Sequence, residues 1–153
     1  MLYDLLKKEK YRPVALQKNI MGHFELIVSI NGMDTNFIVD TGAARTVIDL
    51  AFARELGLQL QDTDIFGGGL GSAKMMLYRV KATKLLICEL PLLIPEVYAI
   101  DMRHVRRTLA ARGISKPANG VIGSDVLIHH QAIIDYPNQL LYLKKAYKMA
   151  EMD

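Results

Sequence analysis

The segment from Phe37 to Ile48 places an aspartate between two short apolar runs. The apolar residues 37–39 lead into Asp40, a Thr-Gly pair follows it, and the run 46–48 leaves. Apolar runs of this length beside a glycine are typical of short buried strands. An ionised carboxylate at the end of a buried strand is costly unless it is hydrogen-bonded or shared with another group. The position of Asp40 therefore indicates a chemical use, although a bare Asp-Thr-Gly is more often a capped turn.

The residues before this segment are expected to form a β-hairpin. Apolar residues alternate with mostly polar ones from Phe24 to Ile30, which is the period of a half-buried strand. Asn31-Gly32 then tolerates the positive φ angles of a tight two-residue turn. The chain is predicted to reverse there into a second strand, 33–39, which delivers Asp40 to a strand end.

A glycine cluster between residues 61 and 74 predicts a second hairpin of a different kind. The polar stretch 61–64 gives way to Phe66-Gly-Gly-Gly-Leu-Gly-Ser72, and the residues from Met75 to Ile87 look extended. Glycines at this density favour a mobile hairpin tip. Gly67–Gly71 also invites comparison with a phosphate-binding loop, but no Gly-Lys-Ser/Thr follows, so nucleotide binding is not favoured.

The remaining elements predicted are short. Asp49 is expected to cap a helix that runs to about Leu56 and stops at Gly57. The apolar stretch 90–100 is interrupted by two prolines, which favours edge strands or a broken strand. Residues 101–112 form an expected surface helix, with Met102, Val105 and Leu109 on one face. A closing hairpin is predicted from the strands 132–134 and 140–143, which flank the turn 135–138.

A second motif downstream gives the first one its meaning. In the segment Gly120–Leu127, two apolar residues lead through Gly123 into an expected short helix. The pair of motifs resembles the retropepsin-like aspartic peptidases over about residues 22–145. This resemblance implies a mainly β, retropepsin-like acid-protease fold: a closed β-barrel-like half with short helices and a flap hairpin, active as a two-fold dimer. The flap is expected within residues 62–78.

The resemblance also assigns roles to individual residues. It implies a catalytic loop in which Asp40 supplies a carboxylate, Thr41 bonds across the dimer axis and Gly42 allows close approach of substrate. Its substrate-binding residues are expected to be Ala43, Ala44, Gly68, Gly69, Leu70, Val121 and Ile122. No metal and no cofactor is implied.

The number of Asp-Thr-Gly motifs predicts a homodimer. Two closely spaced carboxylates share one proton, so that one activates water and the other protonates the substrate carbonyl. The chain has one such motif, because Asp34-Thr35 and Asp62-Thr63 lack the following glycine. The second carboxylate is therefore expected to be Asp40 of another copy, across a two-fold axis.

Two positions depart from the pattern of retroviral members. Ala44 stands where an acidic residue is usual, and Ser124 stands where an Arg is usual, so the stabilising ion pair of those enzymes is missing. The spacing leaves open a substitute contact between Arg45 and Asp125. With the long stretch 101–118, these differences favour a cellular or bacterial type of member.

Composition sets the outer limits of the prediction. A chain of 153 residues with 51% hydrophobic content fits one domain. We divide it into an N-terminal extension (1–20), a peptidase domain (21–146) and a C-terminal tail (147–153). The extension is open to three interpretations: a surface helix, a propeptide remnant or a dimer arm. The single cysteine and the lack of a long apolar run favour a cytoplasmic protein without a membrane segment.

Other signals are assigned ordinary roles. The net charge of +3 is too small and scattered to predict nucleic-acid binding. The arginines 103, 106 and 107 are expected on a solvated helix face. His129-His130 are expected to diverge as surface or packing residues. Cys88 ends an apolar run and is expected to be a packed, inert thiol.

The sequence thus predicts an aspartic endopeptidase, acting on a peptide or protein substrate, with one Asp40 per subunit. Two alternatives stay open. One is a non-catalytic, dimeric module that binds peptides or serves as a scaffold with the same fold, because a fold does not guarantee an activity. The other is a protease domain that is active only within a larger precursor.

Overall fold

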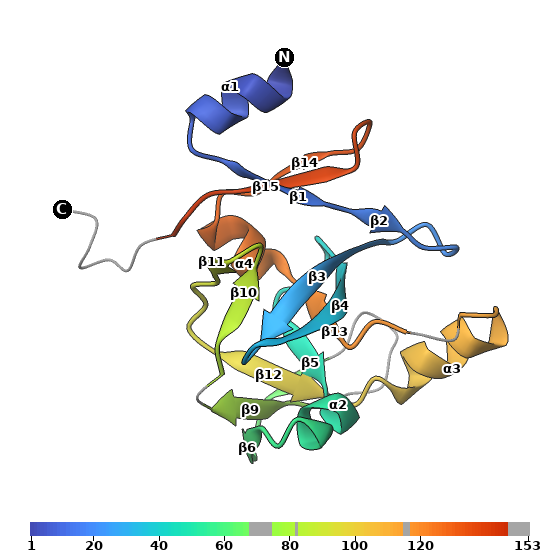
Figure 1. The fold of residues 1–153 in the computed structure, drawn as a ribbon. Helices are drawn as coiled ribbons and strands as arrows, with labels where there is room; N and C mark the ends of the chain where they lie inside the picture. The colour runs from blue at the N-terminus through green and yellow to red at the C-terminus, as the bar shows by residue number, and fades with distance from the viewer. Residues whose placement is uncertain (68–74, 82, 115–116, 147–153) are drawn as a thin grey trace.

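The hairpin that carries Asp40 is the centre of the structure (Figure 1). In this computed structural model, which describes residues 1–67, 75–81, 83–114 and 117–146, β3 (Phe24–Ile30) and β4 (Met33–Val39) pair along their whole length. Asn31 and Gly32 have φ angles of 49° and 90°, the conformation that a tight turn of two residues requires. The predicted hairpin and its turn are confirmed.

A short strand, β13 (Gly120–Ile122), lies between β4 and β5 (Val47–Asp49). It runs parallel to β4, with Ile122 opposite Val39, and antiparallel to β5. A Cβ atom on Gly120 would lie 2.4 Å from the Phe37 ring and 2.6 Å from the Val47 carbonyl oxygen. Only glycine allows this contact, so the predicted strand begins where three segments touch.

The strands form three sheets. A ten-stranded sheet has the order β11-β10-β3-β4-β13-β5-β12-β9-β6, with β2 beside β3. The other two are β1-β15-β14 and the pair β7-β8. The elements not yet bounded are α1 (Leu2–Lys8), β1 (Arg12–Ala15), β2 (Gln17–Lys18), α2 (Leu50–Glu55), β6 (Gln59–Gln61), β7 (Phe66–Gly67), β8 (Met75–Met76), β9 (Tyr78–Lys81), β10 (Leu85–Ile87), β11 (Leu90–Pro91), β12 (Val97–Ile100), α3 (Arg103–Ala111), α4 (Ser124–His129), β14 (Ile133–Asp135) and β15 (Leu140–Leu143).

This mainly β architecture is the predicted one, with one difference in detail. In the described part of the chain, the order of the large sheet has two separate ends, β11 and β6, and does not close into a barrel. Both end strands are short, with two and three residues, so they offer few backbone groups for pairing.

The N-terminal residues pack against the rest of the chain. β1 pairs with β15, with Val14 opposite Leu141, and forms the upper sheet in Figure 1. Val14 and Leu16 are buried in the main hydrophobic core, and Leu6 of α1 is buried as well. The segment 1–20 therefore adds a helix and two strands to the fold.

Helix α2 begins and ends as predicted. The Asp49 carboxylate accepts a hydrogen bond from the Phe52 N–H at 3.1 Å, which satisfies one free donor of the first turn. Gly57, just beyond the helix, has a φ of +70°. The predicted closing hairpin is also present, as β14 and β15.

Three local predictions were wrong in part. Cys88 is exposed, because Cys88 and Glu89 form the tight turn between β10 and β11 with positive φ angles. β12 is an inner strand between β5 and β9, whereas β11 is an edge strand as expected. Leu109 of α3 is buried, and so is Met102, which precedes the helix, but Val105 is 40% exposed.

No helix in the described ranges is long and apolar enough to cross a bilayer.

His130 is a buried contact point between three segments. Its ring accepts a hydrogen bond from the Leu93 N–H through Nε2 and bonds to the Lys144 carbonyl oxygen through Nδ1. The ring is fully buried, whereas His129 is exposed, so the two histidines diverge as predicted. Burial lowers the pKa of His130 below its ordinary value, and the bond to Lys144 opposes this effect.

The buried His130 predicts a loss of stability in acid. The lowered pKa means that, below about pH 6.5, the unfolded chain binds a proton that the folded chain does not. The free energy of unfolding should therefore be largest above this pH and fall as the pH drops through it. Urea titrations between about pH 5 and 8 should show a shallower slope for His130→Gln than for the wild type. His129→Gln is the control, and an equal slope for all three proteins would contradict the account.

Candidate active site

The loop after β4 holds the Asp40 carboxylate at the surface of the single chain. The Asp40 N–H donates to the Ile122 carbonyl oxygen at 3.0 Å, which ties the loop to β13. The Gly42 N–H donates to Asp40 Oδ1 at 2.9 Å, and the Ala43 N–H donates to the Asp40 carbonyl oxygen at 3.1 Å. Asp40, Thr41 and Gly42 are all exposed, so the apolar strand places the carboxylate at its end without burying it.

The second motif is packed against this loop. The Ser124 N–H donates to the Ala43 carbonyl oxygen at 2.7 Å. A Cβ atom on Gly123 would lie 2.7 Å from that same oxygen, so a larger residue would push the two motifs apart.

A buried threonine and an aspartate fasten the two motifs together. Thr46 is fully buried, and its hydroxyl donates to Asp125 Oδ1 at 2.7 Å and accepts the Gly123 N–H at 3.0 Å. The Thr46 N–H donates to Asp125 Oδ2 at 2.9 Å. Hydrogen bonds to a charged group in a buried setting are among the strong ones, so this contact fixes the spacing of the two motifs. We call it the Thr46–Asp125 clamp.

The clamp uses the Asp125 carboxylate that had been considered as a partner for Arg45. Asp125 binds Thr46 and not Arg45, so the substitute contact between Arg45 and Asp125 is not formed in the described structure. The Arg45 guanidinium instead lies over the Tyr98 ring, 4.9 Å from its centroid. The Tyr98 hydroxyl donates to Glu96, and this bond, together with Arg79, lowers the pKa of the Glu96 carboxyl.

A cleft of about 490 Å³ opens beside Asp40. The loop after β4 forms one wall, through Asp40, Gly42 and Ala43. The opposite side is the base of a hairpin, in which Phe66 of β7 pairs with Met76 of β8. The remaining lining residues are Ala44, Arg45, Val47, Gly67, Leu77, Ile100 and Val121.

Most of the expected site residues that the structure describes meet at this cleft. Asp40, Gly42, Ala43, Ala44 and Val121 all line it. Ile122 does not, because its side chain is fully buried in the core and only its carbonyl oxygen reaches the loop.

The expected flap is described only at its base. Gly68, Gly69 and Leu70, with the greater part of the expected tip, lie outside the described residues. The pairing of β7 with β8 falls within the range expected for the flap.

Sequence reasoning missed part of the cleft wall. Leu77 and Ile100 line it, although each looked like an ordinary residue of an extended stretch. Arg45 also lines the cleft, and the sequence carries a signal for it. It is a charged residue five positions after Asp40 that interrupts a run of small and apolar residues.

Thr41 faces a different hollow. The hollow is lined by Thr41, by Leu127 and Ile128 of α4, and by Ile134 of β14. Ile128 is 72% exposed, which is high for a large apolar side chain, and it lines this hollow together with Thr41. Among the described residues, no group of three or more His, Cys, Asp or Glu side chains is arranged to hold a metal ion.

Comparison with known proteins assigns this arrangement to a family. A family model described as aspartyl protease matches residues 26–126, which include the Asp40 loop, β13 and both residues of the Thr46–Asp125 clamp. The chain belongs to the aspartyl protease family. A curated relative in this comparison is an uncharacterized protein in the cobV 5′ region of a Sinorhizobium species, 27% identical over 105 residues. The match covers 69% of this chain and 41% of that protein.

Solved structures share the fold of this aspartyl protease family member. A retropepsin-like aspartic protease from Rickettsia conorii has a TM-score of 0.54 at 20% identity, over 87% of this chain and 89% of its own. The EIAV protease, solved with the inhibitor HBY-793, has a TM-score of 0.56 at 18% identity, over 78% and 98%. The retroviral protease-like domain of Ddi1 from Leishmania major has a TM-score of 0.52 at 17% identity, over 84% and 96%. The predicted retropepsin-like fold is confirmed.

The Thr46–Asp125 clamp predicts a specific pattern of stability loss. Thr46→Val removes the hydroxyl and leaves the Gly123 N–H and one carboxylate oxygen without this partner, at a cost of about 2 kcal/mol in the free energy of unfolding. Thr46→Ser keeps the hydroxyl and should cost less than half as much. Urea denaturation of the two variants checks this, and a loss for Thr46→Ser at least as large as that for Thr46→Val would contradict the account.

Proposed function

We propose that this chain is an aspartic endopeptidase, active as a homodimer in which each subunit supplies one Asp40 carboxylate. The observation that carries the proposal is the placement of Asp40. It is an exposed carboxylate on a loop fixed by β13, and it lines a cleft whose far side is the base of a hairpin. Membership in the aspartyl protease family supports the same reaction class.

The proposed chemistry uses the two carboxylates in different protonation states. The ionised carboxylate takes a proton from a water molecule, whose oxygen attacks the carbonyl carbon of the peptide bond. The protonated carboxylate gives its proton to the carbonyl oxygen, which yields a tetrahedral diol. A proton then passes to the amide nitrogen, the carbon–nitrogen bond breaks, and an acid and an amine leave. The shared proton returns to the pair, so the step needs no cofactor.

Several features support a two-fold dimer through the catalytic loop. The sequence has one Asp-Thr-Gly, so two adjacent carboxylates need two copies of the chain. The exposed Thr41 adjoins an apolar hollow that includes Leu127 and the outward-facing Ile128. A two-fold contact brings the same surface of both subunits together, so a patch next to Asp40 would place the two carboxylates near the axis.

The substrate proposed is an extended peptide. The cleft lies between the loop after β4 and the base of the β7–β8 pair, and an extended peptide there would add its backbone beside a strand edge. Side chains such as Val47, Leu77 and Ile100 give the cleft an apolar floor. Backbone hydrogen bonds would then supply affinity, and the apolar pockets would select side chains.

Replacement of Asp40 tests the proposed reaction. Asp40→Asn removes the carboxylate that must ionise, so cleavage of a peptide library should fall by at least about a thousandfold between about pH 4 and 7. Mass spectrometry of the products gives the readout. Asp34→Asn is the matched control, because Asp34 also precedes a threonine and is exposed on the same hairpin. Equal cleavage by the wild type and Asp40→Asn would exclude the mechanism, and no cleavage by a dimeric wild type would favour the peptide-binding module.

A further inference from the structure

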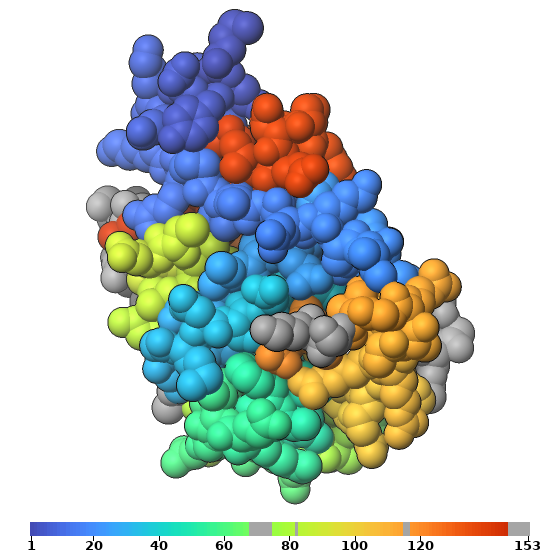
Figure 2. All heavy atoms as spheres, turned by 45° about the vertical axis from the view of Figure 1, so that its right-hand side comes forward, coloured from blue at the N-terminus to red at the C-terminus, as the bar shows by residue number. Residues whose placement is uncertain are grey.

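The segment 101–118, which contains helix α3, carries the net positive charge of the chain. It has five Lys or Arg residues and one Asp, whereas the whole chain has a net charge of +3. The rest of the chain therefore has no excess of positive charge. Figure 2 shows α3, in yellow and orange, on the surface beside the green segment that contains α2.

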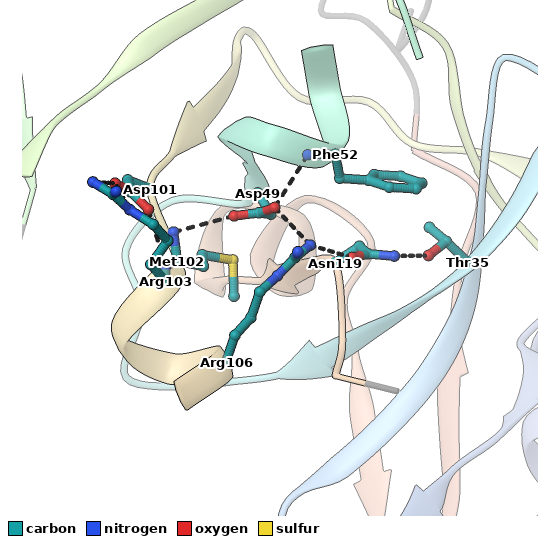
Figure 3. Close-up of polar contacts among 8 residues, drawn as sticks. All are labelled: Thr35, Asp49, Phe52, Asp101, Met102, Arg103, Arg106 and Asn119. Atoms are coloured by element: carbon teal, nitrogen blue, oxygen red, sulfur yellow. Dashed lines mark hydrogen bonds and ion pairs between the residues drawn. The ribbon is translucent and has the colours of Figure 1, made fainter. Parts of the chain in front are cut away.

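One arginine of α3 is used inside the fold and not on the solvated face expected for it. Arg106 Nη2 lies 2.6 Å from Asp49 Oδ2 and donates to Asn119 Oδ1 at 2.7 Å (Figure 3). Asn119 Nδ2 donates in turn to Thr35 Oγ1 of β4 at 2.9 Å. Asp49 is 1% exposed and also accepts the Met102 N–H, just before the helix. This network holds α3 in one position, so its other side chains have a defined place on the surface.

A hollow of about 500 Å³ lies between α3, the start of α2 and β8. Arg103, His104 and Arg107 line it from α3, and Leu50 and Met76 line it from α2 and β8. The remaining lining residues are Met75, Tyr78 and Asp101. We call it the α3 hollow.

The two arginines of the α3 hollow lie on a different side of the helix from Asp40. Val105 and Leu109 line a separate hollow, which reaches Asp40. Arg103 and Arg107 are four positions apart, so they are neighbours on one helix face, and only the α3 hollow has them in its lining. The basic pair is therefore outside the neighbourhood of the Asp40 carboxylate.

The α3 hollow nevertheless adjoins the cleft, because one extended segment separates the two. Side chains alternate between the two faces of an extended chain. Leu77 is 3% exposed and lines the cleft, whereas Met76 and Tyr78 line the α3 hollow. In the same way, Ile100 lines the cleft and Asp101 lines the hollow. A long polypeptide with one part in the cleft can therefore place another part in the hollow.

The positive charge of the α3 hollow is available to a ligand. Arg103 Nε and Nη2 both lie 2.7 Å from Asp101 Oδ2 (Figure 3). The Arg103 side chain is 72% exposed, and an exposed ion pair of this kind exchanges partners at little cost. Among the described residues, the Arg107 guanidinium has no hydrogen-bond or ion-pair partner. Two arginines against one aspartate leave the hollow with a net positive charge.

The lining of the hollow favours an acidic polypeptide as its ligand. A guanidinium binds a carboxylate through two parallel hydrogen bonds. Met76 and Tyr78 add an apolar surface, which an apolar side chain next to the acidic one would cover. Asp101 would repel the closely spaced phosphates of a nucleic acid, and two arginines are few for that ligand.

We propose that the α3 hollow is an exosite that binds an acidic segment of a protein substrate, separate from the segment that occupies the cleft. Arg103 and Arg107 bind the acidic side chains, and Met76 and Tyr78 pack against an apolar neighbour. This inference rests on the proposed peptidase function. The exosite raises the affinity for a long substrate because the second contact becomes intramolecular, and it leaves the chemistry at Asp40 unchanged.

The experiment compares two kinds of peptide as substrates of the full chain. Both contain the same cleaved sequence, and one also carries a tail of alternating Glu and Leu on a Gly-Ser linker, placed at either end in separate peptides. At about 50 mM salt, the tail at one of the two ends should lower KM by at least about tenfold and leave kcat unchanged. Arg107→Glu should abolish this advantage without changing cleavage of the short peptide.

The matched control is Arg112→Glu. Arg112 lies just after the last turn of α3 and does not line the hollow, so this variant makes the same change of charge at another place. It should keep the advantage of the tail. If the tail lowers KM for the wild type at neither end, or if Arg112→Glu loses the advantage as Arg107→Glu does, the exosite is excluded while the peptidase function stands.

Binding of the tail alone separates the exosite from the peptidase function. Fluorescence anisotropy of the labelled tail with Asp40→Asn chains should show binding that Arg107→Glu weakens by at least about tenfold. Tail binding without any cleavage by the wild type would overturn the peptidase function and, with it, the assignment of the ligand as a substrate. Cleavage without tail binding would overturn the exosite alone. A single-stranded RNA of the same charge that binds more tightly than the tail would overturn the choice of a peptide ligand.

Discussion

The close contact of β13 with the Asp40 loop is the constraint on which the rest of the structure depends. Gly120 and Gly123 allow backbone atoms to touch where a Cβ atom would not fit, and the Thr46–Asp125 clamp holds them in that contact. The Asp40 N–H then finds its partner on Ile122, and the carboxylate emerges at the end of β4. The packing of β13 against the loop therefore holds Asp40 in its exposed position. Without this contact, the Asp40 carboxylate would no longer be held at the end of β4.

A second buried carboxylate organises the surroundings of the first. Asp49 lies at the end of β5, caps α2 and pairs with Arg106 of α3, so one group joins the sheet to both helices. Because Asp49 is almost fully buried, loss of Arg106 would leave a charge without its partner in the core. Helix α3 is in this way linked through Asn119 to the hairpin that carries Asp40.

Patterns with a local cause were predictable from the sequence. The alternation in residues 24–30, the Asn31-Gly32 turn and the Asp49 cap each depend on near neighbours, and each is present as expected. Contacts between distant residues were not predictable. Nothing in the sequence indicates that Asp125 binds Thr46, that Arg45 lies over Tyr98 or that α3 borders Asp40. Cys88 shows the limit of a periodic pattern, because a turn with positive φ at non-glycine residues ended the strand before it.

The central claim is that one active site needs two Asp40 carboxylates from two chains, and a mixing experiment tests it most directly. Wild-type and Asp40→Asn chains are unfolded together, refolded at fixed total concentration in varied ratios, and assayed for peptide cleavage. If each site needs two intact chains, activity falls with the square of the wild-type fraction, because mixed dimers are inactive. A linear fall would mean that each chain carries a complete site of its own, and would contradict the account.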